Sequence, residues 1–473
     1  MIASPPSPGG LPSTAKGSVA MVIIALIVAE LASAFETLML YAAMGKLVIL
    51  FDPLRAGWLV TIYLLVQTAS AALGGRLGDL FGRRRLLIIS LFISGCGSLL
   101  SFFAVNYPML LVGRAFQGCA GAVLPLCFGL AYQHLPARWA SMGVGIVAAT
   151  ASLGAGLALL TGGYIVDNFD WHHIFSLGAV LAAAGVVAAK FGLPASLSRP
   201  AAKVDVVGGI LFVPAICLIL LALTLGGRTG WTSYTTIGMA VGGILLCMWW
   251  IRYELRHPEP LLDVRMLAVR SVSASNAVMF FLALGAVQLP LILPLFLSQP
   301  HGGSPGLSAT AIGLVMMPSM LMAVAVSPLA GSLLSVMTER RLAVCAVAIV
   351  LAGWVLIGLS SGQLGVVVGG VILVGVGMAA AMAIFPNIVL AHTPAARHSE
   401  AGGMLTVVRG LGQSVGSQLI ALLIATRGVA TMGLTGVDLV LAYAAGTVAV
   451  ALLLAATLLT NRRLPTATIG SGA

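Results

Sequence analysis

The chain has 473 residues, of which 60% are hydrophobic and 8% are charged, and its mean hydropathy is +1.09. Because a soluble domain carries about 25% charged residues, this composition excludes a soluble globular protein and predicts many membrane spans. The formal net charge of +11 does not indicate nucleic-acid binding, since the basic residues stand between apolar segments rather than in one patch.

A helix that crosses a bilayer needs about 20 mostly apolar residues. By this rule the sequence predicts an all-α polytopic membrane protein. In chain order, the fourteen expected spans are 18–43, 57–75, 86–105, 108–132, 139–163, 173–193, 206–226, 235–253, 272–297, 308–330, 342–360, 363–390, 401–425 and 438–460.

An even number of spans places both termini on one side of the membrane. With that side taken as inner, 18 of the 24 Lys and Arg residues lie inside, 4 lie outside, and Arg114 and Arg409 lie within spans. Because basic residues concentrate on the cytoplasmic side, both termini are expected there. Residues 1–17, rich in Pro, Ser and Gly, are expected to be a disordered N-terminus, and 461–473 a tail.

The segment between the second and third expected spans combines a glycine-rich turn with clustered charge. Glycine permits a tight turn, and one acid among arginines can hold two helix ends together by charge-assisted bonds. An ordinary positive-inside loop explains the arginines but not the spaced glycines with the aspartate. This segment resembles the signature loop of the major facilitator superfamily of transporters. The resemblance implies a conformational latch formed by Gly75, Gly78, Asp79, Gly82, Arg83 and Arg84.

A degenerate copy of this loop follows the tenth expected span. Gly331, Leu333, Arg340 and Arg341 keep the register of the first copy, whereas Ser335 replaces the aspartate. The repeat predicts two six-helix halves, as in this superfamily, at 18–193 and 272–460. The linker 194–271 would then hold two additional transmembrane helices, and its flanks resemble the fourteen-helix drug/proton antiporter branch.

Two acids, Glu30 and Glu36, lie at membrane depth in the first expected span. Ionisable groups there are costly and face a cavity or a partner. The stretch Phe35-Glu36-Thr37 resembles the branch's first-helix motif with glutamate in place of aspartate, which makes Glu36 the expected proton carrier. Glu30 is outside that motif and is either an extra proton or cation site or a protonated packing group.

The stretch Arg114-Ala115-Phe116-Gln117-Gly118 is similar to the family's fourth-helix motif. The resemblance implies that Arg114 acts in proton transfer, because a fixed positive charge favours the ionised form of a nearby carboxyl. Counting about 1.5 Å per helical residue puts Arg114 and Glu36 at nearly the same depth. An ion pair between them would serve either the coupling of proton movement to transport or only the stability of the helix bundle.

The fifth expected span, 139–163, carries four glycines that permit close helix packing. They are Gly154, Gly156, Gly162 and Gly163. The last two match the branch's Gly-Pro-x-x-Gly-Gly motif, but Ala158-Leu159 replaces Gly-Pro, which leaves export versus import open. Further substrate-cavity candidates are polar residues in spans, each of which also fits an ordinary interhelical hydrogen bond. They are Tyr63, Gln67, Gln117, Asn276, Gln288, Asn387, Arg409 and Gln413, and Arg409 either faces the cavity or reaches the cytoplasm.

The sequence holds no phosphate-binding loop and no zinc motif, so neither catalytic residues nor a metal or cofactor are expected. The six cysteines all lie in apolar stretches. The expected function is proton-coupled export of small lipophilic or cationic compounds across a bacterial inner membrane, by a monomer whose partners are substrate, protons and lipid. The alternatives are a symporter or uniporter for one metabolite and, from another class, a membrane sensor or membrane-embedded enzyme.

Overall fold

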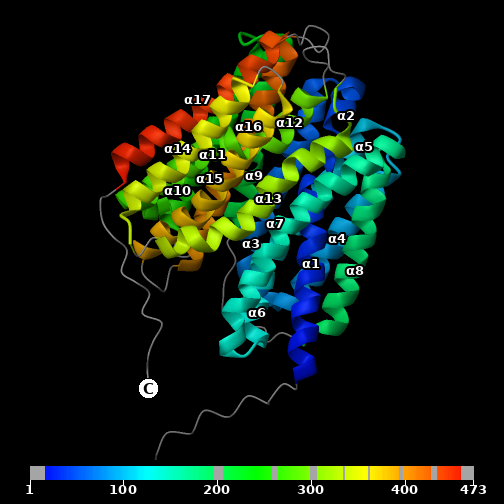
Figure 1. Cartoon of the computed structure of the whole chain (residues 1–473), viewed down its shortest axis with the longest axis vertical. Coiled ribbons are helices and arrows are strands. Elements are labelled where there is room, and N and C mark those ends of the chain that lie inside the picture. Colours follow the sequence, from blue (N-terminus) through cyan, green and yellow to red (C-terminus); the bar gives the residue numbers. More distant parts are fainter. Residues whose placement is uncertain are drawn as a thin grey trace, which may run out of the picture.

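The computed structural model describes residues 16–194, 206–257, 264–298, 306–333, 336–360, 363–393, 398–427 and 434–459, and every regular element among them is helical. Figure 1 shows two groups of helices side by side, one from each half of the chain. The N-terminal group holds α1 (Lys16–Ala42), α2 (Met44–Phe51), α3 (Pro53–Phe81), α4 (Arg83–Phe102), α5 (Tyr107–Gln117), η1 (Gly118–Ala122), α6 (Val123–His134), α7 (Ala137–Asn168) and α8 (His173–Gly192).

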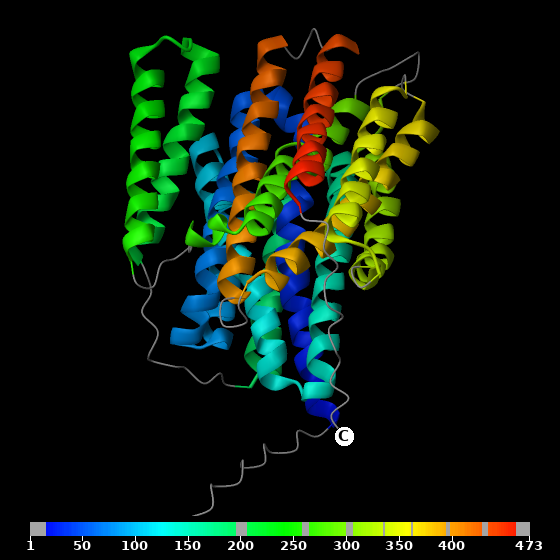
Figure 2. The same ribbon diagram turned by 90° about the vertical axis from the view of Figure 1, so that its left-hand side faces the viewer.

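The C-terminal group has the same general plan. It holds α11 (Arg270–Leu284), η3 (Ala286–Gln288), α12 (Leu289–Leu297), α13 (Ala309–Leu333), α14 (Glu339–Gly358), α15 (Leu364–Ala391), α16 (His398–Arg427) and α17 (Leu434–Leu458). Between the groups come α9 (Val206–Thr229), α10 (Tyr234–Arg256) and the short η2 (Val264–Ala268). In Figure 2, α9 and α10 stand together as a green hairpin at the margin of the molecule.

Local sequence signals set several helix ends. The Asp52 side chain accepts a hydrogen bond from the Arg55 backbone N–H at 3.0 Å, and Pro53 begins α3, which is a favourable first position for proline. Gly82 separates α3 from α4 with a φ of 90°, a conformation that glycine adopts at little cost. The sequence predicts a glycine-rich turn after residue 75, whereas in the structure α3 continues to Phe81 and the chain turns only at Gly82. We call the end of the molecule that carries the Gly82 turn the inner end, and the other end the outer end.

Twelve helices, counted among the described residues, are long and apolar enough to cross a membrane. The expected number of fourteen is therefore not confirmed by length and composition. The two expected spans without a counterpart in this count, 57–75 and 206–226, fall in α3 and α9, which are helical over 29 and 24 residues. In α9 only the segment Pro214–Gly227 meets the apolar criterion, as a shorter helix.

Two expected continuous helices are interrupted. The segment 108–132 changes to a 3-10 helix at Gly118–Ala122, and 272–297 does so at Ala286–Gln288. At Gly121, in the first of these 3-10 segments, the backbone passes close to α3. An added Cβ would lie 2.1 Å from the Gln67 carbonyl oxygen. An apolar window predicts a span but carries no signal for such a contact.

The two halves meet along two helix pairs, α3 with α16 and α7 with α13. The contacts run from the outer end to mid-depth: a Cβ at Gly57 would touch the Ala421 side chain at 2.5 Å, and one at Gly410 would touch Thr68. Towards the inner end the two groups diverge in Figure 1. The halves are thus joined near the outer end.

The inserted helix α9 is fastened to this junction by a buried polar network. The Thr224 hydroxyl accepts hydrogen bonds from Trp58 Nε1 of α3 at 2.8 Å and from Gln418 Nε2 of α16 at 2.7 Å, and donates to the Leu220 carbonyl. Beside it, the hydroxyls of Thr61 and Ser417 lie 2.8 Å apart across the same junction. One hydroxyl of the inserted pair therefore contacts both halves.

Candidate functional site

The carboxyl group of Glu36 lies inside the N-terminal half, on α1, and is 1% exposed. It accepts hydrogen bonds from two serines of α4, from Ser98 Oγ at 2.8 Å and from Ser94 Oγ. The two serines are four residues apart, so their hydroxyls share one face of α4. The packing of α4 beside α1 thus supplies both oxygens of this carboxyl with a donor.

Arg114 of α5 is equally buried, at 1% exposure, and its donors meet three different helices. Its Nε donates to the Leu59 carbonyl at 3.1 Å, and Nη1 donates to Gln117 Oε1 at 2.8 Å and weakly to the Glu36 backbone carbonyl at 3.5 Å. Its guanidinium carbon lies 4.2 Å from the centre of the Tyr63 ring, a cation–π contact. The fixed positive charge is therefore held by the backbone and by neutral side chains.

A direct Glu36–Arg114 ion pair, which the sequence made possible, is not present among the described residues. Gln117 stands between the two groups, because its Nε2 donates to Ser98 Oγ at 2.6 Å while its Oε1 accepts from Arg114. Ser98 then donates to the carboxyl. The two charged groups are consequently connected by a chain of hydrogen bonds through a glutamine and a serine.

Tyr63 and Gln67, one turn apart on α3, join the same region through Thr37 of α1. The Tyr63 and Thr37 hydroxyls lie 2.8 Å apart, and Gln67 Nε2 donates to Thr37 Oγ1 at 3.0 Å and to the Tyr63 hydroxyl at 3.1 Å. We call the whole set the N-half polar cluster. Its members are Glu36, Thr37, Tyr63, Gln67, Ser94, Ser98, Arg114 and Gln117.

Glu30 lies apart from this cluster, on the same helix but nearer the inner end. It is 3% exposed, and its Oε2 has no hydrogen-bond partner among the described residues. An unpartnered carboxyl in apolar surroundings costs far more free energy when ionised than when protonated. The structure therefore leaves both sequence-based interpretations of Glu30 in place.

The C-terminal candidates do not form a matching cluster. Gln288 donates to the Ala283 carbonyl at 3.1 Å and to the Gln413 carbonyl at 2.8 Å, which joins η3 to α16. Asn276 and Asn387 each donate to a carbonyl of their own helix, at 2.9 and 2.7 Å. In the described part of the chain, these amides form no common polar site.

Arg409 of α16 contacts a methionine of the neighbouring helix α15, which leaves both sequence-based interpretations of this arginine in place. Its Nη1 lies 3.2 Å from the sulfur of Met382 on α15, and its Nε is buried without a hydrogen-bond partner among the described residues. The side chain is only partly buried. The guanidinium therefore rests against a neighbouring helix of its own half.

The four glycines of the fifth expected span, 139–163, all lie in α7 where it packs against another helix. An added Cβ would lie 2.9 Å from Ala34 at Gly154 and 3.2 Å from Ala42 at Gly162, both on α1. At Gly163 it would lie 2.5 Å from the Ala309 carbonyl oxygen, and at Gly156 it would lie 3.4 Å from Met320, both on α13. These glycines allow α7 to pack between α1 and the opposite half.

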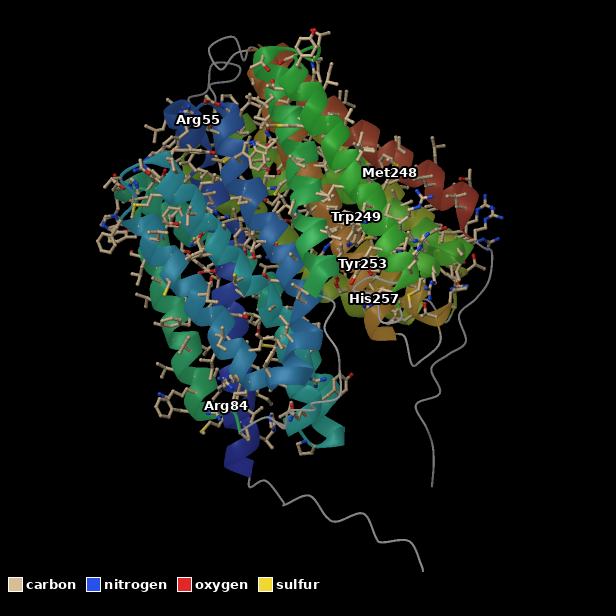
Figure 3. All side chains as sticks on the ribbon, turned by 180° about the vertical axis from the view of Figure 1, so that it is seen from behind. Arg55, Arg84, Met248, Trp249, Tyr253 and His257 are labelled. Atoms are coloured by element: carbon tan, nitrogen blue, oxygen red, sulfur yellow. The ribbon has the colours of Figure 1, made fainter. Side chains whose placement is uncertain are left out.

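The signature loop lies at the inner end, where Figure 3 shows Arg84 at the opposite end from Arg55. Arg83 Nη1 donates to the Gly129 carbonyl of α6 at 2.8 Å, and Arg84 Nε donates to the Ala189 carbonyl of α8 at 3.2 Å. A Cβ at Gly78 would lie 2.6 Å from Leu126. The surroundings of Gly75 and the side chain of Asp79 fall outside what the structure describes, as does part of the second loop copy.

The described residues contain no group of three potential metal ligands. The structure is that of a polytopic helical protein. Some of its ionisable groups are buried between helices, and buried ionisable groups are typical of membrane transporters. The chain belongs to the Major Facilitator Superfamily, because the model of that family matches residues 13–417. It is therefore a membrane protein of a transporter family and not an enzyme.

Two relatives place the chain more closely. It is 27% identical over 325 residues to "Multidrug resistance protein 3" of Bacillus subtilis, which covers 67% of this chain and 62% of that protein. It is 25% identical over 371 residues to "Multidrug resistance protein Stp" of Mycobacterium tuberculosis, which covers 78% and 68%. The chain spans about three fifths of the length of the first relative. Both names agree with the resemblance to the drug/proton antiporter branch.

Solved structures share the fold at lower sequence identity. A D-xylose–proton symporter superposes with a TM-score of 0.68 at 13% identity, over 94% of this chain and 98% of that one. A peptide transporter in complex with sulfate gives a TM-score of 0.68 at 19% identity, over 92% and 93%. At such identities the similarity establishes the fold alone.

Proposed function

We propose that this protein is a proton-coupled secondary transporter that exports small lipophilic or cationic compounds by alternating access. The observation that carries the proposal is the setting of Glu36, a buried carboxyl that two serines hold and that a glutamine connects to Arg114. A buried carboxyl beside a fixed positive charge is a suitable proton carrier. The relatives named as multidrug resistance proteins support export over import.

The chemistry of the N-half polar cluster supports a cycle in which Glu36 binds and releases a proton. Burial disfavours the carboxylate, whereas the serine donors and the nearby guanidinium favour it. Because these effects oppose one another, a small movement of α4 or α5 against α1 changes the balance and moves a proton. Rocking of one half against the other, the usual motion of such folds, supplies that movement.

The remaining expectations belong to this proposal. α3 and α9 also cross the bilayer, which gives fourteen spans, and both termini lie in the cytoplasm of a bacterial cell with the chain in the inner membrane. The protein uses the proton gradient with no cofactor and acts as a monomer. Gln67 and Tyr63 line the substrate path from the N-terminal half, with Arg409 opposite.

A symporter or uniporter for one metabolite is the second candidate. It is favoured by Ala158-Leu159, which replaces the Gly-Pro pair expected of an antiporter. The direction of proton movement separates the two candidates. The test uses inverted vesicles and a panel of dyes and metabolites, with and without a pH gradient. An antiporter takes up substrate as protons leave the vesicle, whereas a uniporter gives a flux that does not depend on the gradient.

The residue-level test compares Glu36→Gln with the matched variant Glu30→Gln, both of which remove one buried acid from α1. We expect Glu36→Gln to abolish transport driven by the pH gradient while substrate binding or exchange stays measurable. We expect Glu30→Gln to retain gradient-driven transport. Uphill transport by Glu36→Gln at the wild-type rate would exclude Glu36 as the carrier and direct the search to Glu30.

A further inference from the structure

A basic pocket lies at the inner end of the C-terminal half, between the first turn of α14 and the last turns of α17. It has a volume of about 280 Å³ and is lined by Arg340, Arg341, Val344 and Ala456. Ligand sites begin at about 300 Å³, so this pocket suits a small group or the head of a larger molecule. It lies far from the N-half polar cluster in the fold and takes no part in the proton path proposed above.

The two arginines of this pocket are exposed, and neither has an acidic partner among the described residues. The adjacent acid, Glu339, is 1% exposed and its Oε1 lies 3.6 Å from His392 Nε2 of α15. A third arginine, Arg270 at the start of α11, donates to the Thr457 carbonyl at 3.1 Å, directly beside Ala456. Positive charge from three arginines, in two places of the sequence, therefore collects around the end of α17.

The pocket opens onto an apolar surface that continues towards the middle of the membrane. Val344 and Ala456 form its apolar lining. About one turn further along each helix from Arg341 and from Ala456, Cys345 of α14 is exposed and Leu453 of α17 is 64% exposed. A molecule held by the arginines would thus have its polar part at the inner end and an apolar path beside the same two helices.

We propose that this pocket binds the phosphate of an anionic phospholipid, with Arg340 and Arg341 on the head group and an acyl chain along the α14–α17 surface. Arginine suits phosphate because its planar guanidinium donates two parallel hydrogen bonds. Basic pockets between transmembrane helices at the cytoplasmic side are typical sites for acidic lipid head groups. The adjoining apolar surface favours a lipid over free phosphate.

The test uses the full-length purified protein in mixed micelles that contain phosphatidylglycerol or phosphatidylcholine, with native mass spectrometry to count bound lipids. The variant Arg340→Gln/Arg341→Gln removes two charges from the pocket. The control Arg252→Gln/Arg256→Gln removes two exposed charges from the inner end of α10. We expect the preference for phosphatidylglycerol to fall about 30-fold in the pocket variant and to change less than about 3-fold in the control.

A second variant keeps both charges, so that a folding defect in the first does not decide the result. Ala456→Phe fills the pocket, and we expect it to lose the same lipid preference. An equal loss in the α10 control, or retention of the preference in both pocket variants, would overturn the proposal. Displacement of bound phosphatidylglycerol by inorganic phosphate alone would overturn the lipid assignment and make this a site for free anions.

Discussion

Asp167, in the last turn of α7, spans the junction between the halves at the outer end. Its carboxylate accepts from the backbone N–H groups of Ala309 and Thr310 at 3.0 and 2.8 Å, and from Thr310 Oγ1 at 2.6 Å. These groups begin α13, so an acid of one half caps a helix of the other half. When the outer end opens, α7 and α13 must separate and these three hydrogen bonds must break.

The magnitude follows from the type and setting of these bonds. Loss of a capping side chain costs about 0.5–2 kcal/mol, and a hydrogen bond to a charged group contributes about 1.5–3 kcal/mol when buried. The contact is exposed, so solvent screening reduces its contribution, and we adopt about 1–2 kcal/mol. We therefore expect Asp167→Ala to shift the equilibrium towards the outer-open state by about 5–30-fold.

The assay measures how fast an interface cysteine reacts with a membrane-impermeant maleimide added from the outside. The reporter is Gly156→Cys in a background without the native cysteines, because Gly156 is buried against Met320 of α13. Asp167→Ala should accelerate labelling by the stated factor. The matched control is Asp170→Ala, since Asp170 bonds only within its own loop, to the His172 N–H at 2.9 Å and to its Nδ1 at 2.5 Å.

Two results would refute the reasoning. Labelling of the Asp167→Ala variant at the wild-type rate would mean that the cap contributes nothing to closure. An equal acceleration by Asp170→Ala would mean that removing any negative charge from this end has the effect. The backbone N–H of His172 lowers the pKa of Asp170, so both acids carry the same charge near neutral pH and the comparison is like for like.

Three further predictions concern other parts of the chain. A cysteine placed at Asn168 should react with an impermeant label from outside whereas one at Gly82 should not, and the reverse pattern would invert the proposed orientation. Asp79→Asn should slow turnover with little change in substrate affinity, and a collapse of affinity at normal turnover would contradict the latch. Gly113→Ala should destabilise the protein by about 1–3 kcal/mol, seen as a lower melting temperature, because its Cβ would lie 2.8 Å from a backbone carbonyl oxygen. Gly446→Ala should leave the melting temperature unchanged, because a Cβ there would meet no neighbouring side chain or helix within 4 Å. An equal loss of stability in both variants would contradict the packing argument.

The sequence predicted the family and the main members of the polar cluster because ionisable residues in an apolar span have few harmless explanations. Glu36 and Arg114 stand out on that ground, and Gln117 follows from its place in the motif. Ser94 and Ser98 were missed, since a serine in a membrane helix is an ordinary small residue. Their four-residue spacing was the only signal, and it gains meaning only once α4 is known to face α1.

Contacts between distant parts of the chain could not be predicted from the sequence for a similar reason. Asp167 at the end of a span looks like any solvated acid, and its partner Thr310 lies 143 residues away. The same holds for the predicted ion pair, because equal depth in the membrane does not tell which side chain stands between two charged groups. The glutamine between Glu36 and Arg114 is visible only in three dimensions.

The attachment of α9 through Thr224 bears on how a chain of this kind can be shortened. If α9 and α10 were deleted, Trp58 Nε1 and Gln418 Nε2 would lose their shared acceptor and would meet hydrocarbon instead. Each unmatched donor in lipid costs several kcal/mol, so the remaining bundle would need apolar replacements at both positions. A derivative without α9 and α10 is therefore reached by excision together with substitution of Trp58 and Gln418. Excision alone should yield a poorly folding protein.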